Sequence, residues 1–271
     1  MGITDPIPGT STVSVNTNLF WDNNEDGFTG TNPIDGTPQF VDPNAGNYHI
    51  GIDSAAIDSG VESSVTSDID EDPRSDGSPD IGADEFFPVN PKEGTVGTEI
   101  TLRNFRFGTK KGTVMIGSAA LKTLEWKDGV IRCRLARALS PGTYDITINP
   151  KPYDTATPIT LASAITIKEP EIATVTPGNA PPKTEVTITG NFFGTKVLPP
   201  PSRTTLPTVY LEYDKGGITK KKYCTVITWA MNPTTGESTI TFRVPKGLST
   251  GPHPLKMTNK VGTAETSFTI D

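Results

Sequence analysis

The residues best suited to chemistry are oxygen-bearing side chains in an acidic stretch near the start of the chain. Asp22, Asn24 and Asp26 occupy the first, third and fifth positions of a segment whose sixth residue is Gly27. Hard oxygen ligands at alternate positions converge on one Ca²⁺ ion where a glycine turns the chain. The twelfth position is Pro33 instead of glutamate, so the loop departs from a complete EF-hand. The segment is a candidate calcium loop, with a solvated Asx-rich turn as the alternative.

A second acidic cluster follows about forty residues later. Asp68, Asp70 and Asp72 also alternate along the chain, and Arg74 neutralises part of their charge. Carboxylates at this spacing are suited to the same hard cation. The predicted metal ligands are therefore Asp22, Asn24, Asp26, Asp68, Asp70 and Asp72. Calcium is the expected cofactor.

Catalytic constellations are poorly supported. The chain has only two histidines, His49 and His253, and contains no Gly-x-Ser-x-Gly motif. Neither histidine has a serine or cysteine partner at a triad spacing. Carboxylates are plentiful in the first 87 residues, so composition leaves a glycosidase-like pair open. We expect a protein that is not an enzyme, and predict no catalytic residues.

Three consecutive lysines, Lys220, Lys221 and Lys222, form the most basic run. Such a patch suits an anionic glycan or nucleic acid. Lysines also guard solvated strand edges against unwanted pairing, which is the simpler interpretation. The net charge of −7 argues against a nucleic-acid partner.

Charge divides the chain into regions of different character. Residues 1–90 hold 17 acids and one base, whereas residues 91–271 hold 14 acids and 23 bases. This asymmetry indicates at least two folding units. The 26 glycines and 25 prolines interrupt the chain too often for a helical bundle. No run of 18 apolar residues is present, so no transmembrane segment is expected.

The second part of the chain repeats itself. Thr98-Glu99-Ile100-Thr101-Leu102 recurs as Thr184-Glu185-Val186-Thr187-Ile188, and Phe107-Gly108-Thr109-Lys110 recurs as Phe193-Gly194-Thr195-Lys196, both at an offset of 86. Trp126 matches Trp229 at an offset of 103, which places 17 additional residues of the second copy between Lys196 and Trp229. Insertions of this kind are tolerated in loops. Residues 88–169 and 170–271 are therefore two copies of one domain.

Each copy is predicted to be all-β. Short alternating segments separated by Gly, Pro and Asn at 8–12-residue spacing are typical of an immunoglobulin-like sandwich. In copy one we expect strands at 100–102, 114–116, 130–135, 144–148 and 165–167. Cys133 and Cys224 are expected as buried thiols in separate cores. Trp126 and Trp229 are equivalent, which favours a core or hairpin role over sugar stacking.

The openings of both copies carry a resemblance to a known family. Pro91-x-x-Gly94-x-x-Gly97-Thr98-x-Ile100-x-Leu102 resembles the start of the IPT/TIG immunoglobulin-like domains, as does Thr184-x-Val186-Thr187-Ile188-x-Gly190-x-x-Phe193. The closing element Ser140-Pro141-Gly142-Thr143-Tyr144 is also similar, although Asn104-Phe105-Arg106 stands where a glycine is usual. The resemblance implies two tandem IPT/TIG sandwiches.

Residues 1–87 resemble a different family, the C-terminal end of right-handed parallel β-helix surface proteins. The resemblance lies in Phe40-Val41-Asp42-Pro43, Ser54-Ala55-Ala56-Ile57-Asp58-Ser59-Gly60 and Asp80-Ile81-Gly82-Ala83-Asp84-Glu85. It implies terminal coils and a cap, with a strand at 11–20 and Trp21 as a capped core aromatic. The predicted fold is all-β: β-helix coils at 1–87, followed by the two sandwiches.

These resemblances imply a secreted or cell-surface protein, with surface-layer or adhesion roles. The first hypothesis is a non-enzymatic structural spacer with interaction modules and calcium stabilisation. Its expected partners are other copies of the chain or cell-surface glycan. The alternative is an accessory C-terminal region of a carbohydrate-active β-helix enzyme resembling polysaccharide lyases, or a glycan-binding module. An acidic first region joined to basic sandwiches also predicts head-to-tail pairing between copies that weakens with salt.

Overall fold

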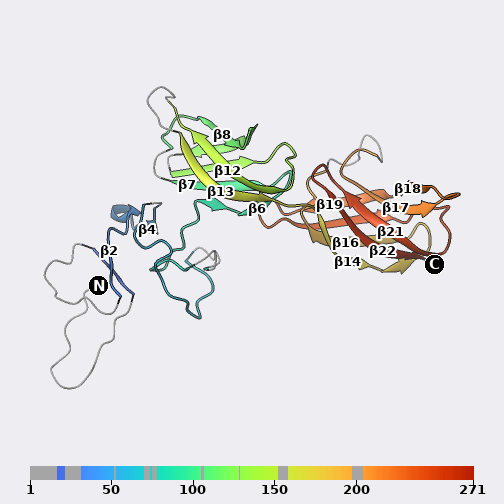
Figure 1. Ribbon diagram of the computed structural model, residues 1–271, viewed down its shortest axis with the longest axis horizontal. Helices are drawn as coiled ribbons and strands as arrows, with labels where there is room; N and C mark the ends of the chain where they lie inside the picture. Colours follow the sequence, from blue (N-terminus) through green and yellow to red (C-terminus); the bar gives the residue numbers. More distant parts are fainter. Residues whose placement is uncertain are drawn as a thin grey trace, which may run out of the picture. The chain divides into compact units, whose positions relative to one another are not determined.

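The chain divides into two compact units in a computed structural model (Figure 1). The structure describes residues 17–21, 32–51, 53–69, 74, 78–104, 107–127, 129–151, 158–196 and 204–271. The first unit comprises residues 1–88 together with 103–106, and the second comprises 89–102 and 107–271. Apart from one 3₁₀ turn, the regular elements of the described residues are all β-strands. None of these described elements is a helix long and apolar enough to cross a membrane.

The first unit is built from short strands and ordered loops. Its elements are β1 (Leu19–Phe20), β2 (Ile34–Asp35), β3 (Phe40–Asp42), the 3₁₀ helix η1 (Pro43–Ala45) and β4 (Asn47–Ile50). β1 and β2 pair in parallel, whereas β3 and β4 pair antiparallel. Asp42 caps η1 by accepting the Ala45 N–H at 3.2 Å. One parallel pair is too little to make a β-helix, so the β-helix assignment stays a prediction.

Successive passes of the chain through the first unit are joined by backbone hydrogen bonds. The Phe20 carbonyl accepts from Gly36, the Thr37 carbonyl from Ala55, and the Ala56 carbonyl from Ile81. These passes enclose a small apolar core of Ile50, Ala56 and Phe86, with Leu19, Ile57 and Ile81 packed against it. The predicted strand at 11–20 lies mostly outside the described residues, which show only its end, β1.

The second unit begins with a sandwich of two sheets, drawn in green to yellow in Figure 1. One sheet has the order β10-β11-β7-β5 and the other has the order β6-β13-β12-β8-β9. The strands are β5 (Val89–Asn90), β6 (Glu93–Gly94), β7 (Glu99–Asn104), β8 (Thr113–Ile116), β9 (Ala119–Ala120), β10 (Lys122–Lys127), β11 (Gly129–Arg134), β12 (Gly142–Asn149) and β13 (Ile159–Ile167).

A second sandwich follows with the same topology. Its sheets have the orders β14-β16-β20-β19 and β15-β22-β21-β17-β18. The strands are β14 (Glu171–Thr176), β15 (Asn179–Ala180), β16 (Glu185–Asn191), β17 (Thr208–Asp214), β18 (Thr219–Tyr223), β19 (Thr225–Met231), β20 (Glu237–Arg243), β21 (Gly251–Thr258) and β22 (Thr263–Ile270). Two tandem immunoglobulin-like sandwiches therefore make up this unit.

The two sandwiches match strand for strand, and they differ in length at two edges. At one edge, β5 has two residues and its counterpart β14 has six. β9 of the first sandwich is two residues long, whereas its counterpart β18 has five; the preceding strand also lengthens, from the four residues of β8 to the seven of β17. The longer hairpin lies within the part of the sequence where the second copy has its 17 additional residues. The strand orders of the sheets are thus the same in both copies, whereas edge strands, among them β18, are longer in the second.

Each core is closed by the same aromatic arrangement. Phe107 and Phe193 are fully buried, and each packs against the equivalent tryptophan with ring centroids 6.2 and 6.5 Å apart. Trp126 Nε1 donates to the Gly108 carbonyl at 2.9 Å, and Trp229 Nε1 donates to the Gly194 carbonyl at 2.7 Å. The prediction of a core or hairpin role for both tryptophans is confirmed.

Both cysteines are buried, Cys133 in β11 and Cys224 between β18 and β19. Cys133 belongs to the first core and Cys224 to the second, and both are free thiols. Burial raises the pKa of Cys133 to about 12 and raises the pKa of Cys224 as well. Neither thiol is therefore a reactive nucleophile at neutral pH. The prediction of separate buried thiols is confirmed.

The expected strands of copy one are present, together with four that were not expected: β5, β6 and β9, of two residues each, and β10, of six. Each expected segment falls within or almost within β7, β8, β11, β12 or β13. β10 was not predicted, because its sequence Lys-Thr-Leu-Glu-Trp-Lys lacks clean alternation and its register shifts between Thr123 and Glu125. A shift of this kind interrupts the period of two on which strand prediction depends.

We predict that Phe107→Ala and Phe193→Ala each destabilise their own sandwich by about 3–5 kcal/mol, because each removes a fully buried ring. Hydrogen exchange followed by mass spectrometry reports the two sandwiches separately. Phe40→Ala, at a partly exposed ring in the first unit, is the control. Equal protection in the wild type and both core variants would contradict the packing role of these rings.

Candidate functional site

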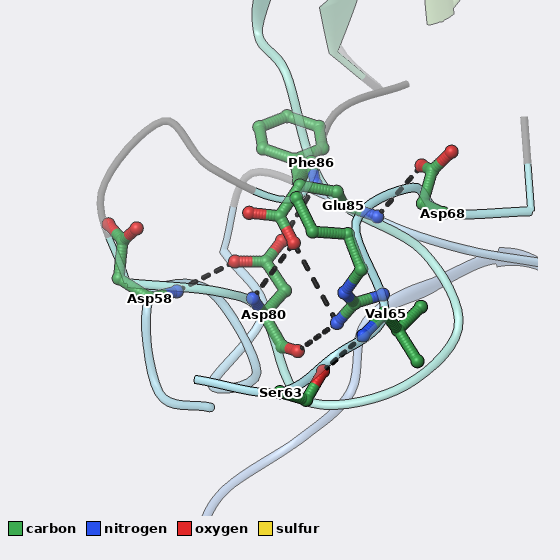
Figure 2. A network of polar contacts seen from close by, with 8 residues as sticks. Asp58, Ser63, Val65, Asp68, Asp80, Glu85 and Phe86 are labelled. Atoms are coloured by element: carbon green, nitrogen blue, oxygen red, sulfur yellow. Dashed lines mark hydrogen bonds and ion pairs between the residues drawn. The ribbon is translucent and has the colours of Figure 1, made fainter. Parts of the chain in front are cut away.

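The candidate site is the acidic segment 80–85 at the end of the first unit. The Asp80 carboxylate accepts two backbone N–H groups at 2.7 Å, that of Asp58 at Oδ1 and that of Phe86 at Oδ2 (Figure 2). The Asp80 side chain is buried, so its charge is held by these donors instead of by water. A single carboxylate therefore ties together chain passes 22 residues apart.

Two further buried acids continue the network. Asp84 accepts the Ile50 N–H at 2.7 Å, and Glu85 Oε2 accepts the Asp80 N–H at 3.0 Å. Arg74 donates to the Asp80 carbonyl at 2.6 Å and lies 3.7 Å from Glu85 Oε2. The side chains of Arg74 and Glu85 are only 9% and 1% exposed. Arg74, the one base among residues 1–90, is thus placed where it offsets buried negative charge.

The structure places one of the six predicted metal ligands. Asp68 is half-buried, and its Oδ2 accepts the Glu85 N–H at 3.1 Å, as Figure 2 shows. The other five, Asp22, Asn24, Asp26, Asp70 and Asp72, lie outside the described residues. Within the part of the chain that is described, no group of three His, Cys, Asp or Glu is placed to hold a metal. Calcium binding therefore stays a prediction.

The same unit carries a groove lined by exposed rings. Its volume is about 480 Å³, and its lining includes Leu19, Trp21, Phe40, Tyr48, Ile69 and Asp84. Phe40 and Tyr48 meet edge to face with centroids 5.4 Å apart. Trp21 is 56% exposed, so the prediction of a capped core aromatic is wrong. We call this feature the aromatic groove.

His253 has a structural position. Its Nδ1 faces the Glu212 carbonyl oxygen at 3.0 Å and its Nε2 faces the Ser249 carbonyl oxygen at 2.9 Å. The ring is buried between these backbone groups. Both nitrogens are therefore engaged in holding the second sandwich together, and the chain remains without a predicted catalytic histidine.

Comparisons with known proteins return solved structures only. No protein-family model and no curated protein matches the sequence. The Plexin A4 full extracellular region is similar over 68% of this chain and 18% of its own, with 14% identity and a TM-score of 0.38. SGBP-B from the mixed-linkage glucan utilization locus of Bacteroides ovatus, in complex with a mixed-linkage heptasaccharide, is similar over 66% and 43%, with 13% identity and a TM-score of 0.29.

A third similar structure is SGBP-B from a complex xyloglucan utilization locus in Bacteroides uniformis. It covers 67% of this chain and 47% of its own length, with 16% identity and a TM-score of 0.31. The chain thus spans less than half of each of these three proteins. At such low similarity, these structures support no conclusion about what the chain binds.

The buried carboxylates Asp80, Asp84 and Glu85 were not among the predicted site residues. Acidic residues are rarely buried, so composition alone places them on the surface. One signal was available: three acids within six residues, on either side of Ile81, Gly82 and Ala83, in a region with a single base. Such a pattern points to carboxylates that satisfy backbone donors inside a loop.

We predict that Asp80→Asn destabilises the first unit by about 1–3 kcal/mol, because an amide –NH₂ cannot accept the second backbone N–H. Asp58→Asn is the matched control, since only its backbone N–H joins the network and its side chain is exposed. Hydrogen exchange at amides 58 and 86 measures the effect. Unchanged protection in Asp80→Asn would show that the carboxylate does not hold the loop.

Proposed function

We propose that this chain is a non-enzymatic segment of a secreted or cell-surface protein, in which two IPT/TIG-type sandwiches act as a structural spacer and as interaction modules. Its proposed partners are other copies of the chain and cell-surface glycan, and its proposed setting is a surface layer or an adhesion protein. Labelling of intact producing cells with a membrane-impermeant amine reagent tests the location.

The observation that carries the spacer role is the braced junction between the sandwiches. Val261, in the turn between β21 and β22 of the second sandwich, packs against the core of the first. The Glu99 N–H in β7 donates to the Pro233 carbonyl in the turn between β19 and β20 at 2.8 Å. Contacts of this kind restrict motion between tandem domains, as a spacer that holds its length requires.

Glu99 also secures its own strand beside that junction. Its carboxylate binds Arg132 at 3.0 Å and forms a second ion pair with Arg134. The hydrogen bond from Arg134 is the main reason that the pKa of Glu99 lies below its ordinary value. These ion pairs stabilise the folded state fully at pH values above the ordinary pKa of glutamate. Their contribution is lost as the pH falls through the lowered pKa of Glu99.

We also propose that the first unit closes the end of a parallel β-helix. Support comes from the parallel β1–β2 pair and from the ordered backbone hydrogen bonds between later passes of the chain. Hydrogen bonds between successive passes are what stacked coils require. Calcium is the proposed stabilising ion of this unit, held by the acidic loops that begin at Asp22 and Asp68.

We predict that Val261→Asp loosens the junction, weakening the coupling between the sandwiches by about 1–2 kcal/mol through the loss of a partly buried apolar contact. Small-angle scattering of dilute protein at high salt, where copies are separate, should show a more flexible tandem. Val61→Asp is the matched control, because it makes the same change at an exposed position of the first unit. Identical scattering from both variants and the wild type would refute the braced spacer.

We predict that chelation of calcium lowers the unfolding temperature of the first unit. A ligand at 100 times its dissociation constant stabilises the native state by about 2.7 kcal/mol. Asp22→Asn combined with Asp26→Asn should abolish the response of the first loop. Asp68→Asn tests the second loop separately, because its side-chain oxygen can still accept the Glu85 N–H. An unchanged unfolding midpoint in chelator would eliminate the calcium role.

A further inference from the structure

Exposed apolar side chains are concentrated in the first unit. Of the ten large hydrophobic residues that are exposed among those described, seven belong to it: Trp21, Phe40, Val41, Tyr48, Val61, Val65 and Ile69. Four of these line the aromatic groove: Trp21, Phe40, Tyr48 and Ile69. Apolar surface gathered in one hollow, on an otherwise strongly charged unit, marks an interaction site.

The negative charge of the first unit restricts what can bind in the groove. Residues 1–90 carry 17 acids against one base. Exposed acids of the described part include Asp35, Asp42, Asp53, Asp58 and Glu62, and Asp84 lines the groove itself. A favourable occupant is therefore apolar at its tip and cationic along its sides.

The second sandwich presents such a surface on one of the two edges that are longer than in the first sandwich. β18 is the last strand of its sheet and pairs only with β17 in the described structure. It carries Lys220, Lys221 and Lys222, and the turn before it exposes 57% of Ile218. That turn is closed by the Lys215 N–H, which donates to the Ile218 carbonyl at 3.0 Å. We call Ile218 and the three lysines the lysine edge.

The acid opposite the lysine edge is shared with another lysine. Glu212 of β17 lies opposite Lys221, but its carboxylate is 2.9 Å from Lys256 of β21. Lys221 Nζ lies 4.5 Å from the centroid of the Tyr210 ring, and the hydrogen bond with Tyr210 is the main reason its pKa is raised. The lysine therefore stays charged across the physiological range.

The other edge strand with exposed lysines is a useful contrast. β10 of the first sandwich carries Lys122 and Lys127, with Leu124 39% exposed between them. There, Glu125 forms an ion pair with Lys127 at 2.5 Å, so the edge is not uniformly cationic. Lysines without an apolar neighbour are sufficient to protect an edge strand from pairing with a strand of another molecule. An exposed isoleucine beside three adjacent lysines does not serve that purpose.

We propose that the lysine edge of one copy docks in the aromatic groove of a second copy, with Ile218 entering the groove and the lysines facing the acids of the first unit. The contact joins two different surfaces, so each copy in a dimer still has one free surface, either a groove or an edge. Further copies can therefore add head to tail. This inference rests on the proposed function as an interaction segment and names the two surfaces through which copies would meet.

The test uses two variants of the full chain that each lose one surface. Tyr48→Lys/Ile69→Lys places positive charge in the groove, and Ile218→Ser/Lys220→Glu removes the tip and reverses one charge of the edge. Lys122→Glu/Leu124→Ser on β10 is the matched control, with the same kinds of change on another edge strand. Circular dichroism and thermal unfolding confirm that all variants are folded.

Mass in solution is measured by analytical ultracentrifugation over a range of concentrations. Wild type and the β10 control should form species beyond the dimer at low salt, and association should weaken on the order of tenfold at high salt. Each surface variant alone should stay monomeric. An equimolar mixture of the two should form one dimer and nothing larger, because only one intact groove and one intact edge remain.

Three results would overturn the proposal: a wild type that stays monomeric at every concentration, surface variants that associate like the wild type, or a mixture that fails to dimerise. Retention of polysaccharide by the wild type that is lost in the groove variant, with association unchanged, would assign the groove to glycan instead. The junction experiment uses separated copies at high salt. A failure of docking is therefore distinguishable from a failure of the spacer role.

Discussion

Each sandwich depends on a backbone carbonyl that is held by an indole N–H. The carbonyl belongs to a glycine that follows a fully buried phenylalanine, Gly108 in one copy and Gly194 in the other. Both glycines have positive φ, +65° and +78°, which a residue with a side chain rarely adopts. The turn lets the chain leave the core beside the phenylalanine, and the tryptophan ring then covers that phenylalanine. This hydrogen bond holds together the glycine and the tryptophan, which are the two ends of the segment between them. The segment can therefore lengthen without disturbing the sheets.

The distribution of change between the copies follows from that constraint. Buried positions such as Ile100 and Val186 occupy equivalent strands, and the sheet orders are the same. The added residues instead lengthen β17 and β18 and the segment before them. A core substitution costs several kcal/mol, whereas an exposed hairpin tolerates change. New binding properties are therefore expected at edges and turns, where the lysine edge and the junction turn with Val261 both lie.

The sandwiches were predictable from sequence because their strands alternate and their repeat is explicit. Cys133 falls on the inner face of such a strand and Cys224 lies between β18 and β19, and each is buried in its own core. β10 was missed because charged residues and a register shift obscure its alternation. The site was less predictable: Asp80 is buried through backbone donors from residues 58 and 86, which only the folded loop brings together. Likewise, the exposure of Trp21 depends on which other segments of the chain pack over its ring. The sequence around Trp21 has no hydrophobic periodicity from which that exposure could be predicted.

The acidic charge of the first unit connects the proposed calcium binding with the proposed docking between copies. Buried carboxylates such as Asp80 and Asp84 already have backbone donors, so the exposed acids supply most of the field that attracts a cation. A divalent ion bound in the acidic loops adds two positive charges and weakens that field. The lysine edge of a second copy would then be attracted less strongly over a Debye length of about 8 Å at physiological salt. Calcium would therefore stabilise the unit while weakening the electrostatic part of docking, and the apolar contact of Ile218 would be the part that calcium does not affect.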